Sequence, residues 1–200
     1  PATARVHQST DLHLIAPVQR SGVPTTPIER TLLDLGAVVP PTRVQLALDH
    51  ALRAGLTTID RLLGTLVRHA RRGRRGVRPL RELLAEQLEQ GSTPDSGLER
   101  LVVILLREAG LPRPTLQHPV TIGGHAYRTD LCYPEARVAI EPDGSIHLRR
   151  DVWQSDHERQ NALVLAGWTI LRFTWGDYRR HPERIVREVE RALAMGAVGR

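Results

Sequence analysis

The sequence lacks lysine and has a single cysteine, and both shortages restrict its chemistry. All 28 residues counted as lysine or arginine are arginines, so no lysine can act as a catalytic group. Cys132 alone can form neither an intrachain disulfide nor a cysteine-based zinc site. We interpret Cys132 as a small, buried residue of a strand.

Long apolar runs and several familiar motifs are also missing. No run approaches the roughly 20 apolar residues of a membrane helix, and the first residues do not resemble a signal peptide. The sequence has no glycine-rich phosphate loop after a strand, no G-x-S-x-G elbow, and no zinc-like spacing among its 9 histidines. We therefore expect a cytoplasmic protein without a membrane segment. Because the chain begins at Pro1 rather than Met, we also expect an upstream element to be missing.

Positive charge is concentrated in the first half of the chain. The first 91 residues hold 13 arginines against 8 acidic residues, and many of these arginines alternate with glycine in residues 68–78. Such a flexible, cationic segment can follow the phosphates of a nucleic-acid backbone. A solvated connector between two helices is the plainer alternative. The arginines of this segment are Arg68, Arg71, Arg72, Arg74, Arg75 and Arg78.

Acidic residues cluster in the strand-like stretch 128–147. Acids within β-rich sequence are costly to desolvate, so they usually bind a cation. If 133–136 form the turn of an antiparallel hairpin, position 130 pairs with 139 and position 128 with 141. Asp130, Glu141 and Asp143 then share a face. Asp130 and Glu141 become diagonal neighbours that can both reach one Mg²⁺, whereas a slip of one residue would remove the site.

The first half of the chain has mainly helical spacing. A small hairpin is expected within residues 1–25. Thr26, Pro27 and Glu29 then match an N-cap, an N1 proline and the N3 residue of a capping box. Apolar residues at spacings of three and four predict helices after this start and over 40–55, 57–70 and 77–91.

The pattern changes after residue 91. The spacings predict the order α-β-β-β-α-β-α, with the last strand over 167–175. A crossover from the third strand through a helix to a strongly apolar strand indicates a mixed sheet with helices on its faces. The sequence therefore predicts an α/β protein with a mainly helical region, 1–91, followed by a mixed-sheet domain, 92–200.

The element order and the acids together resemble the PD-(D/E)XK nuclease superfamily, whose fold is restriction-endonuclease-like. LERLVVILLREAGLPRP, RTDLCYPEARVAIEPDG and DHERQNALVLAGWTILRFTW are similar to a bacterial family related to the very-short-patch repair (Vsr) endonuclease. GVPTTPIERTLLDL and the helices after it resemble part of an AbiEi-type antitoxin region. The residues on the nuclease family's pattern are Glu99, Asp130, Glu141, Asp143, His147, Asp156, Arg159 and Arg172.

The resemblance implies metal-assisted hydrolysis of a phosphodiester in DNA, in repair or in defence. Mg²⁺ or Mn²⁺ would be held by Asp130 and Glu141. Asp143, Glu99 and His147 would complete the catalytic group, with His147 as a general acid or base.

Each of these residues also has a structural interpretation. Asp130 can cap a turn at the end of a strand, and Asp143 can form an ordinary Asp-Gly turn. Glu99 can close a capping box with Ser96, which would leave its carboxylate bound to a backbone N–H. His147 can equally well serve the local structure of the turn.

The neighbouring residues bear on activity. Arg159 and Gln160 follow on the next helix, where they can contact phosphate or, for Arg159, pair with the acids. Arg172 is expected to neutralise the pocket or anchor packing. The superfamily's signature lysine is absent, with Asp143 at its place. Pro142 removes a backbone N–H, which disfavours a fully paired central strand and indicates an edge or a bulge.

Two function classes follow. The first is a Mg-dependent DNA endonuclease whose helical region adds nonspecific affinity for DNA. The second is a catalytically inactive DNA-binding or antitoxin-like regulator on a nuclease fold. Both predict salt-sensitive DNA binding, so only cleavage separates them. A nuclease with one site that cuts both strands would favour a homodimer.

Overall fold

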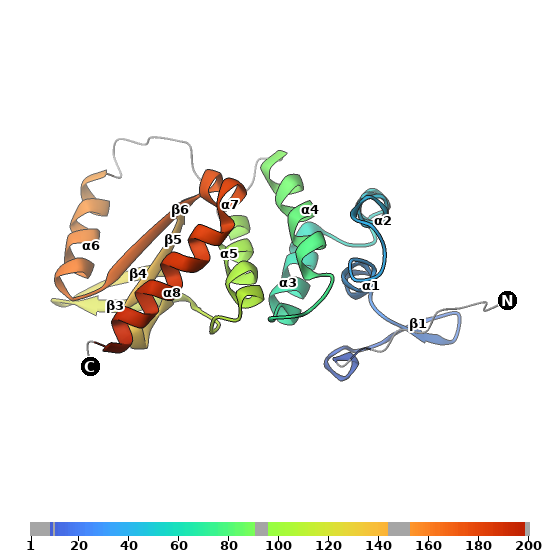
Figure 1. Cartoon of the computed structure of the whole chain (residues 1–200), viewed down its shortest axis with the longest axis horizontal. Helices are drawn as coiled ribbons and strands as arrows, with labels where there is room; N and C mark the ends of the chain where they lie inside the picture. The colour runs from blue at the N-terminus through green and yellow to red at the C-terminus, as the bar shows by residue number, and fades with distance from the viewer. Residues whose placement is uncertain (1–8, 10, 91–95, 144–152, 199–200) are drawn as a thin grey trace.

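The computed structural model describes residues 9, 11–90, 96–143 and 153–198 (Figure 1). Within these ranges a helical part comes first and a four-stranded mixed sheet with flanking helices comes second. This arrangement confirms the predicted α/β class and the predicted change of pattern between the two halves.

A short β-hairpin precedes the helices. After the 3₁₀ turn Leu12–Leu14, β1 (Val18–Arg20) pairs antiparallel with β2 (Val23–Thr25). Ser21 and Gly22 connect the strands, and both have positive φ angles of 49° and 77°. Two successive positive φ values are typical of a type I′ turn, which matches the twist of a hairpin. The small hairpin predicted within residues 1–25 is confirmed.

Four helices form the helical part. Their inward faces carry leucines at spacings of three and four, as the sequence predicts, and these leucines are buried. The helices are α1 (Ile28–Leu35), α2 (Pro41–Arg53), α3 (Ile59–His69) and α4 (Val77–Gln90).

The capping box expected at the start of α1 is wrong. The N-cap residue is Pro27, and no side chain caps the helix. The Glu29 carboxylate instead accepts a hydrogen bond of 2.7 Å from the Thr57 hydroxyl and pairs with Arg61 at 2.9 Å. Because Glu29 is buried against α3, a tertiary contact takes the carboxylate that local spacing assigned to the cap.

The second half follows the predicted element order and adds one short helix. The sheet order is β3-β4-β5-β6, with β3, β4 and β5 antiparallel and β5 parallel to β6. The elements are α5 (Ser96–Ala109), β3 (Thr115–Ile122), β4 (His125–Tyr133), the 3₁₀ turn Pro134–Ala136, β5 (Val138–Asp143), α6 (Trp153–Leu165), β6 (Thr169–Thr174), α7 (Trp175–Arg180) and α8 (Pro182–Val198).

The predicted register of the β4–β5 hairpin is wrong by two residues. Tyr133 pairs with Val138, so the turn occupies 134–137 rather than 133–136. The turn closes through Arg137, which has a left-handed φ of 50°. A shift of two residues keeps every side chain on its predicted face, because the side-chain period of a strand is two.

Pro142 lies on an inner strand rather than an edge strand, but the prediction that it disfavours full pairing is confirmed. Pro142 pairs with Phe173 of β6. On the β4 side, the ladder reaches only Ile140, opposite Leu131. The strand is therefore paired along its whole length on one side only, which agrees with the missing proline N–H.

One apolar core runs through both parts of the chain. It includes Leu33 and Leu80 of the helical part, Leu101 of α5, and Ile140 and Phe173 of the sheet. Helix α5 contacts α3 and α4 on one side and β5 and α8 on the other. Figure 1 shows α5 between the sheet and α4, with α8 lying across the sheet. Helix α5 therefore joins the two parts.

The two faces of the sheet have different covers. Val138 and Ile140 of β5 belong to the core shared with α5 and α8. Ala139 and Glu141 alternate with them and project from the other face, where Arg159 of α6 reaches Glu141. Cys132, paired with Ala139, is buried on this second face, which confirms its predicted burial, and burial raises the pKa of its thiol.

Within the described ranges, no helix combines the length and the apolar character that crossing a membrane requires.

Candidate functional site

Glu141 lies at the centre of a group of polar side chains on the sheet. Its partner in the parallel β5–β6 register is Arg172. On the other side, continuing the β4–β5 register one residue beyond Leu131↔Ile140 brings Asp130 opposite Glu141. Positions opposite each other in an antiparallel register share a face. The paired residues end at Ile140, so Asp130 and Glu141 lie on one face just beyond the ladder.

Gln117 lies at the matching position of the fourth strand, between the pairs Leu116↔Leu131 and His118↔Thr129. We call Asp130, Glu141 and Arg172, at neighbouring positions of β4, β5 and β6, the polar row.

The backbone of Gln117 is strained, with a φ of 50° that non-glycine residues rarely adopt within a strand. Strain of this kind clusters at functional sites. The Gln117 side-chain amide donates a hydrogen bond of 3.3 Å to the Glu99 carboxylate of α5, the helix that covers the other face of the sheet. Nothing in the sequence indicated Gln117, since an amide in a strand carries no motif.

Two guanidinium groups hold the Glu141 carboxylate. Arg159 Nη2 lies 2.8 Å from Glu141 Oε1, and Arg172 Nη2 lies 3.0 Å from Oε2. Glu141 is only 6% exposed, so these pairs compensate the desolvation of its charge. Arg172 therefore neutralises the pocket, as predicted, and Arg159 pairs with an acid, which was one of the two predicted roles.

Only some of the hydrogen-bond donors of the Arg159 guanidinium have an acceptor. Its Nη1 donates to the Arg128 carbonyl oxygen at 2.9 Å. Its Nε is buried and has no hydrogen-bond partner. A buried donor without a partner costs about 1–3 kcal/mol, so the observed position does not use the full bonding capacity of the side chain.

The remaining predicted residues are placed as follows. Asp143 is the exposed last residue of β5, paired with Thr174, and lies on the face of Glu141 by the period of two. Gln160 is half-buried on α6, next to Arg159. His147 lies outside the described residues.

The polar row offers oxygen ligands for a metal ion. Within the residues that the structure describes, no group of three or more His, Cys, Asp or Glu side chains forms a metal-binding cluster. Mg²⁺ commonly uses only one or two carboxylates and keeps several waters, so Asp130 and Glu141 fit its preferences. Both oxygens of Glu141 are paired with arginines, however, and these two positive charges oppose the approach of a cation.

The arginine-rich loop between α3 and α4 is less flexible than predicted. The Arg74 side chain is 12% exposed and lies 2.9 Å from Asp34 and 3.5 Å from Asp11. Arg78 pairs with Glu82 within α4. Arg74 thus anchors the loop to the helical part, while the exposed arginines of the segment 68–78 are Arg68, Arg71, Arg72, Arg75 and Arg78.

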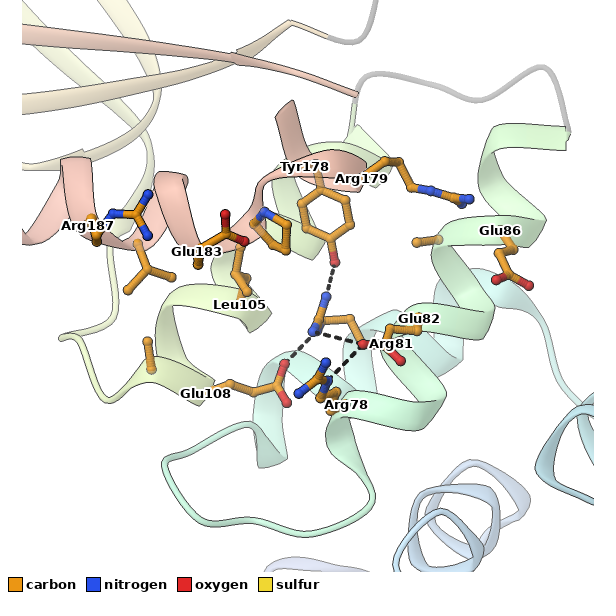
Figure 2. A pocket seen from close by; sticks show the side chains of 14 residues that line it. Arg78, Arg81, Glu82, Glu86, Leu105, Glu108, Tyr178, Arg179, Glu183 and Arg187 are labelled. Atoms are coloured by element: carbon orange, nitrogen blue, oxygen red, sulfur yellow. Dashed lines mark hydrogen bonds and ion pairs between the residues drawn. The ribbon is translucent and has the colours of Figure 1, made fainter. Parts of the chain in front are cut away.

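A separate hollow of about 730 Å³ lies between α4, α5, α7 and α8 (Figure 2). The buried Arg81 guanidinium bridges Glu108 and Tyr178 there, at 2.5 Å and 2.7 Å. Burial raises the pKa values of Glu108 and Tyr178. The lining of the hollow contains four arginines and four glutamates, and it contains no residue of the polar row. Arg78 is the one predicted site residue in this lining. We interpret this network as a structural joint between the two parts.

A family comparison now adds to this geometry. Residues 99–193 match the model of a restriction endonuclease-like family, REase_MTES_1575. The match covers α5, all four strands and the polar row. It supports a nuclease-like domain in this part of the chain.

Two proteins of Mycobacterium tuberculosis resemble the chain. The uncharacterized protein MT2308 (strain CDC 1551 / Oshkosh) and the uncharacterized protein Rv2248 (strain ATCC 25618 / H37Rv) are each 35% identical to it over 124 residues. The alignment covers 61% of this chain and 45% of each relative, so it spans about half of their length. No solved structure matches the chain significantly.

Proposed function

We propose that residues 92–200 form a metal-dependent DNA endonuclease that hydrolyses phosphodiester bonds, in repair or in defence. The observation that carries this proposal is the placement of Asp130 and Glu141 on one face of the sheet, in one polar row with Arg172. Paired carboxylates beside arginines suit a cation and a phosphate in the same place. The family match over residues 99–193 supports the same chemistry.

Each residue of the site has a proposed role. Asp130 and Glu141 would hold Mg²⁺ or Mn²⁺, which when bound polarises a phosphate and stabilises developing negative charge. Glu99 and Asp143 add negative charge around the pair. His147 is proposed to move a proton to or from water or the leaving oxygen.

The substrate contacts are proposed to come from both halves of the chain. Arg159 and Gln160 on α6 would bind phosphate oxygens near the polar row. The arginine-rich loop, 68–78, would add contacts to the DNA backbone that do not depend on sequence. Cutting both strands with one site per chain would favour a homodimer.

A second candidate function is a catalytically inactive DNA-binding or antitoxin-like regulator. One observation favours it: both oxygens of Glu141 are bound by arginines, in a chain without the superfamily's lysine. On this alternative, the polar row is a structural ion-pair network and the arginines serve DNA binding only.

Cleavage of DNA tests the proposal. Duplex, mismatched and single-stranded DNA are incubated with Mg²⁺ or Mn²⁺ and wild-type protein, Asp130→Asn, or the control Glu190→Gln, which changes an exposed acid of α8. We expect Asp130→Asn to lower the cleavage rate by at least about a hundredfold and Glu190→Gln to leave it unchanged. No cleavage of any substrate, together with no metal binding by calorimetry, would overturn the endonuclease.

A further inference from the structure

Both oxygens of Glu141 are paired with arginines before any cation or nucleic acid arrives. Arg159 occupies Oε1 and Arg172 occupies Oε2. A divalent cation that approaches this carboxylate meets two positive charges within the distance of a hydrogen bond. The resting site therefore opposes the cation that the proposed function requires.

The two arginines are not held equally. Arg172 directs both Nε and Nη2 at one oxygen, at 3.1 Å and 3.0 Å, and the β5–β6 register fixes its backbone opposite Glu141. Arg159 reaches Glu141 through a single nitrogen, and its buried Nε has no partner. Arg159 is therefore the arginine that gains most from a different acceptor.

A phosphodiester is such an acceptor. The guanidinium fork can bind two phosphate oxygens at once, and these bonds are stronger than bonds between neutral groups. A phosphate beside α6 would satisfy donors of Arg159 that one carboxylate oxygen and the Arg128 carbonyl leave unused.

We propose that Arg159 couples DNA binding to cation binding: the DNA phosphate draws Arg159 away from Glu141 and so opens Glu141 to the divalent cation. This inference rests on the proposed function and deepens it, because it names a regulation of the same site. The protein binds the cation weakly by itself and tightly in the presence of DNA. By linkage, the cation strengthens DNA binding by the same factor.

Calorimetry with Mn²⁺ tests the coupling without turnover. Full-length protein is titrated with Mn²⁺ alone and in the presence of a short duplex with phosphorothioate linkages, whose integrity is checked on a gel. We expect the duplex to tighten Mn²⁺ binding by about tenfold in the wild type, and Mn²⁺ to tighten duplex binding equally. A wild-type Mn²⁺ affinity that does not respond to the duplex, or no Mn²⁺ binding under either condition, would overturn the inference.

Substitution of Arg159 identifies the coupling residue. Arg159→Gln is expected to bind Mn²⁺ alone about tenfold more tightly than the wild type, with less than about twofold further gain from the duplex. The matched control Arg191→Gln removes one exposed positive charge from α8 and should behave as the wild type. Equal Mn²⁺ affinities in Arg159→Gln and Arg191→Gln would refute the role of Arg159.

Two further measurements keep the outcomes distinct. If Arg159→Gln does not fold, Arg159→Lys is measured in its place. The lysine ammonium lacks the forked geometry of the guanidinium, so Mn²⁺ binding should tighten by about threefold. Unchanged Mn²⁺ binding in Arg159→Lys would count against the coupling. Cleavage is scored separately on unmodified duplex. Cleavage without coupling refutes this inference alone, whereas coupling without cleavage refutes the endonuclease and keeps the coupling.

Discussion

Glu141 faces Arg172 across the parallel β5–β6 pair, with 3.0 Å between Glu141 Oε2 and Arg172 Nη2. Each is the fourth residue of its strand, in the segments VAIEPD and TILRFT. Sliding β6 by one residue would move Arg172 to the opposite face and leave Glu141 with Arg159 alone. The ion pair therefore favours one alignment of the two strands.

The first prediction concerns the stability that Arg172 provides. Arg172→Gln should lower the free energy of unfolding by about 1–2 kcal/mol, less than the 3–5 kcal/mol of a fully buried pair, because Arg159 still compensates Glu141. Urea denaturation measures the loss. The exposed Arg180 on α7 provides a control, since Arg180→Gln should cost less than about 0.5 kcal/mol. Equal losses in the two variants would show that the pair contributes nothing to stability.

The second prediction concerns Arg81, which joins α4 to α5 and α7. Arg81→Met removes the hydrogen bonds to Glu108 and Tyr178 and leaves the partly buried Glu108 carboxylate without its cation. We expect a loss of about 3 kcal/mol in the free energy of unfolding.

Arg78 supplies the matched control for Arg81. Both arginines lie on α4 and pair with a glutamate, but the Arg78 side chain is 76% exposed. Arg78→Met should therefore change stability by less than about 0.5 kcal/mol in the same denaturation experiment. If Arg81→Met is as mild as Arg78→Met, the network in Figure 2 does not hold the two parts together.

The third prediction concerns acid stability and Asp11. Burial by itself raises the pKa of Asp11, but the Ser9 hydrogen bond and the charges of Arg30 and Arg74 lower it from 3.8 to about 2. A carboxyl whose pKa is lower in the folded state stabilises the fold above the unfolded pKa. This stabilisation, about 2–3 kcal/mol at neutral pH, is lost as the pH falls from about 4 to about 2.

Asp11→Asn isolates this contribution. The variant should be less stable than the wild type at pH 7, and the difference between the two should shrink as the pH falls toward 2. Chemical denaturation at several pH values measures it, with the exposed Glu190→Gln as the control. A difference that stays constant from pH 7 to pH 2 would exclude the proposed role of the Asp11 charge.

The sequence was sufficient for the element order and for the faces of the strands. Alternation with period two put Asp130 and Glu141 on one face, and a register error of two residues left that result intact. The error arose in the turn, where Arg137 adopts a left-handed conformation. No residue type at 134–137 indicates that conformation, so the register of the two strands could not be read from the sequence.

Long-range partners were the other limit of prediction. Arg81 looks like any polar residue of an amphipathic helix, because Tyr178, its hydrogen-bond partner, is 97 residues away in the chain. Glu29 matched a local capping pattern but serves Thr57 instead. Such contacts depend on how two helices pack against each other. The spacing of residues within one helix does not determine that packing.

The last prediction concerns the glycines of the arginine-rich loop. Gly73 and Gly76 both have left-handed φ angles, 77° and 89°. A Cβ at Gly73 would meet nothing within 4 Å, whereas a Cβ at Gly76 would collide with the Leu33 carbonyl oxygen and approach the Ala37 nitrogen at 3.0 Å. Gly73→Ala should therefore cost only the backbone strain, about 1–2 kcal/mol.

Gly76→Ala should cost at least about 2 kcal/mol more than Gly73→Ala, because α1 and α4 must separate to admit the methyl group. Urea denaturation of both variants gives the two free energies of unfolding, and unchanged m-values would show that the same unfolding transition is compared. Equal costs would mean that the close approach of Gly76 to α1 is not needed, and that the loop is as flexible as its composition suggests.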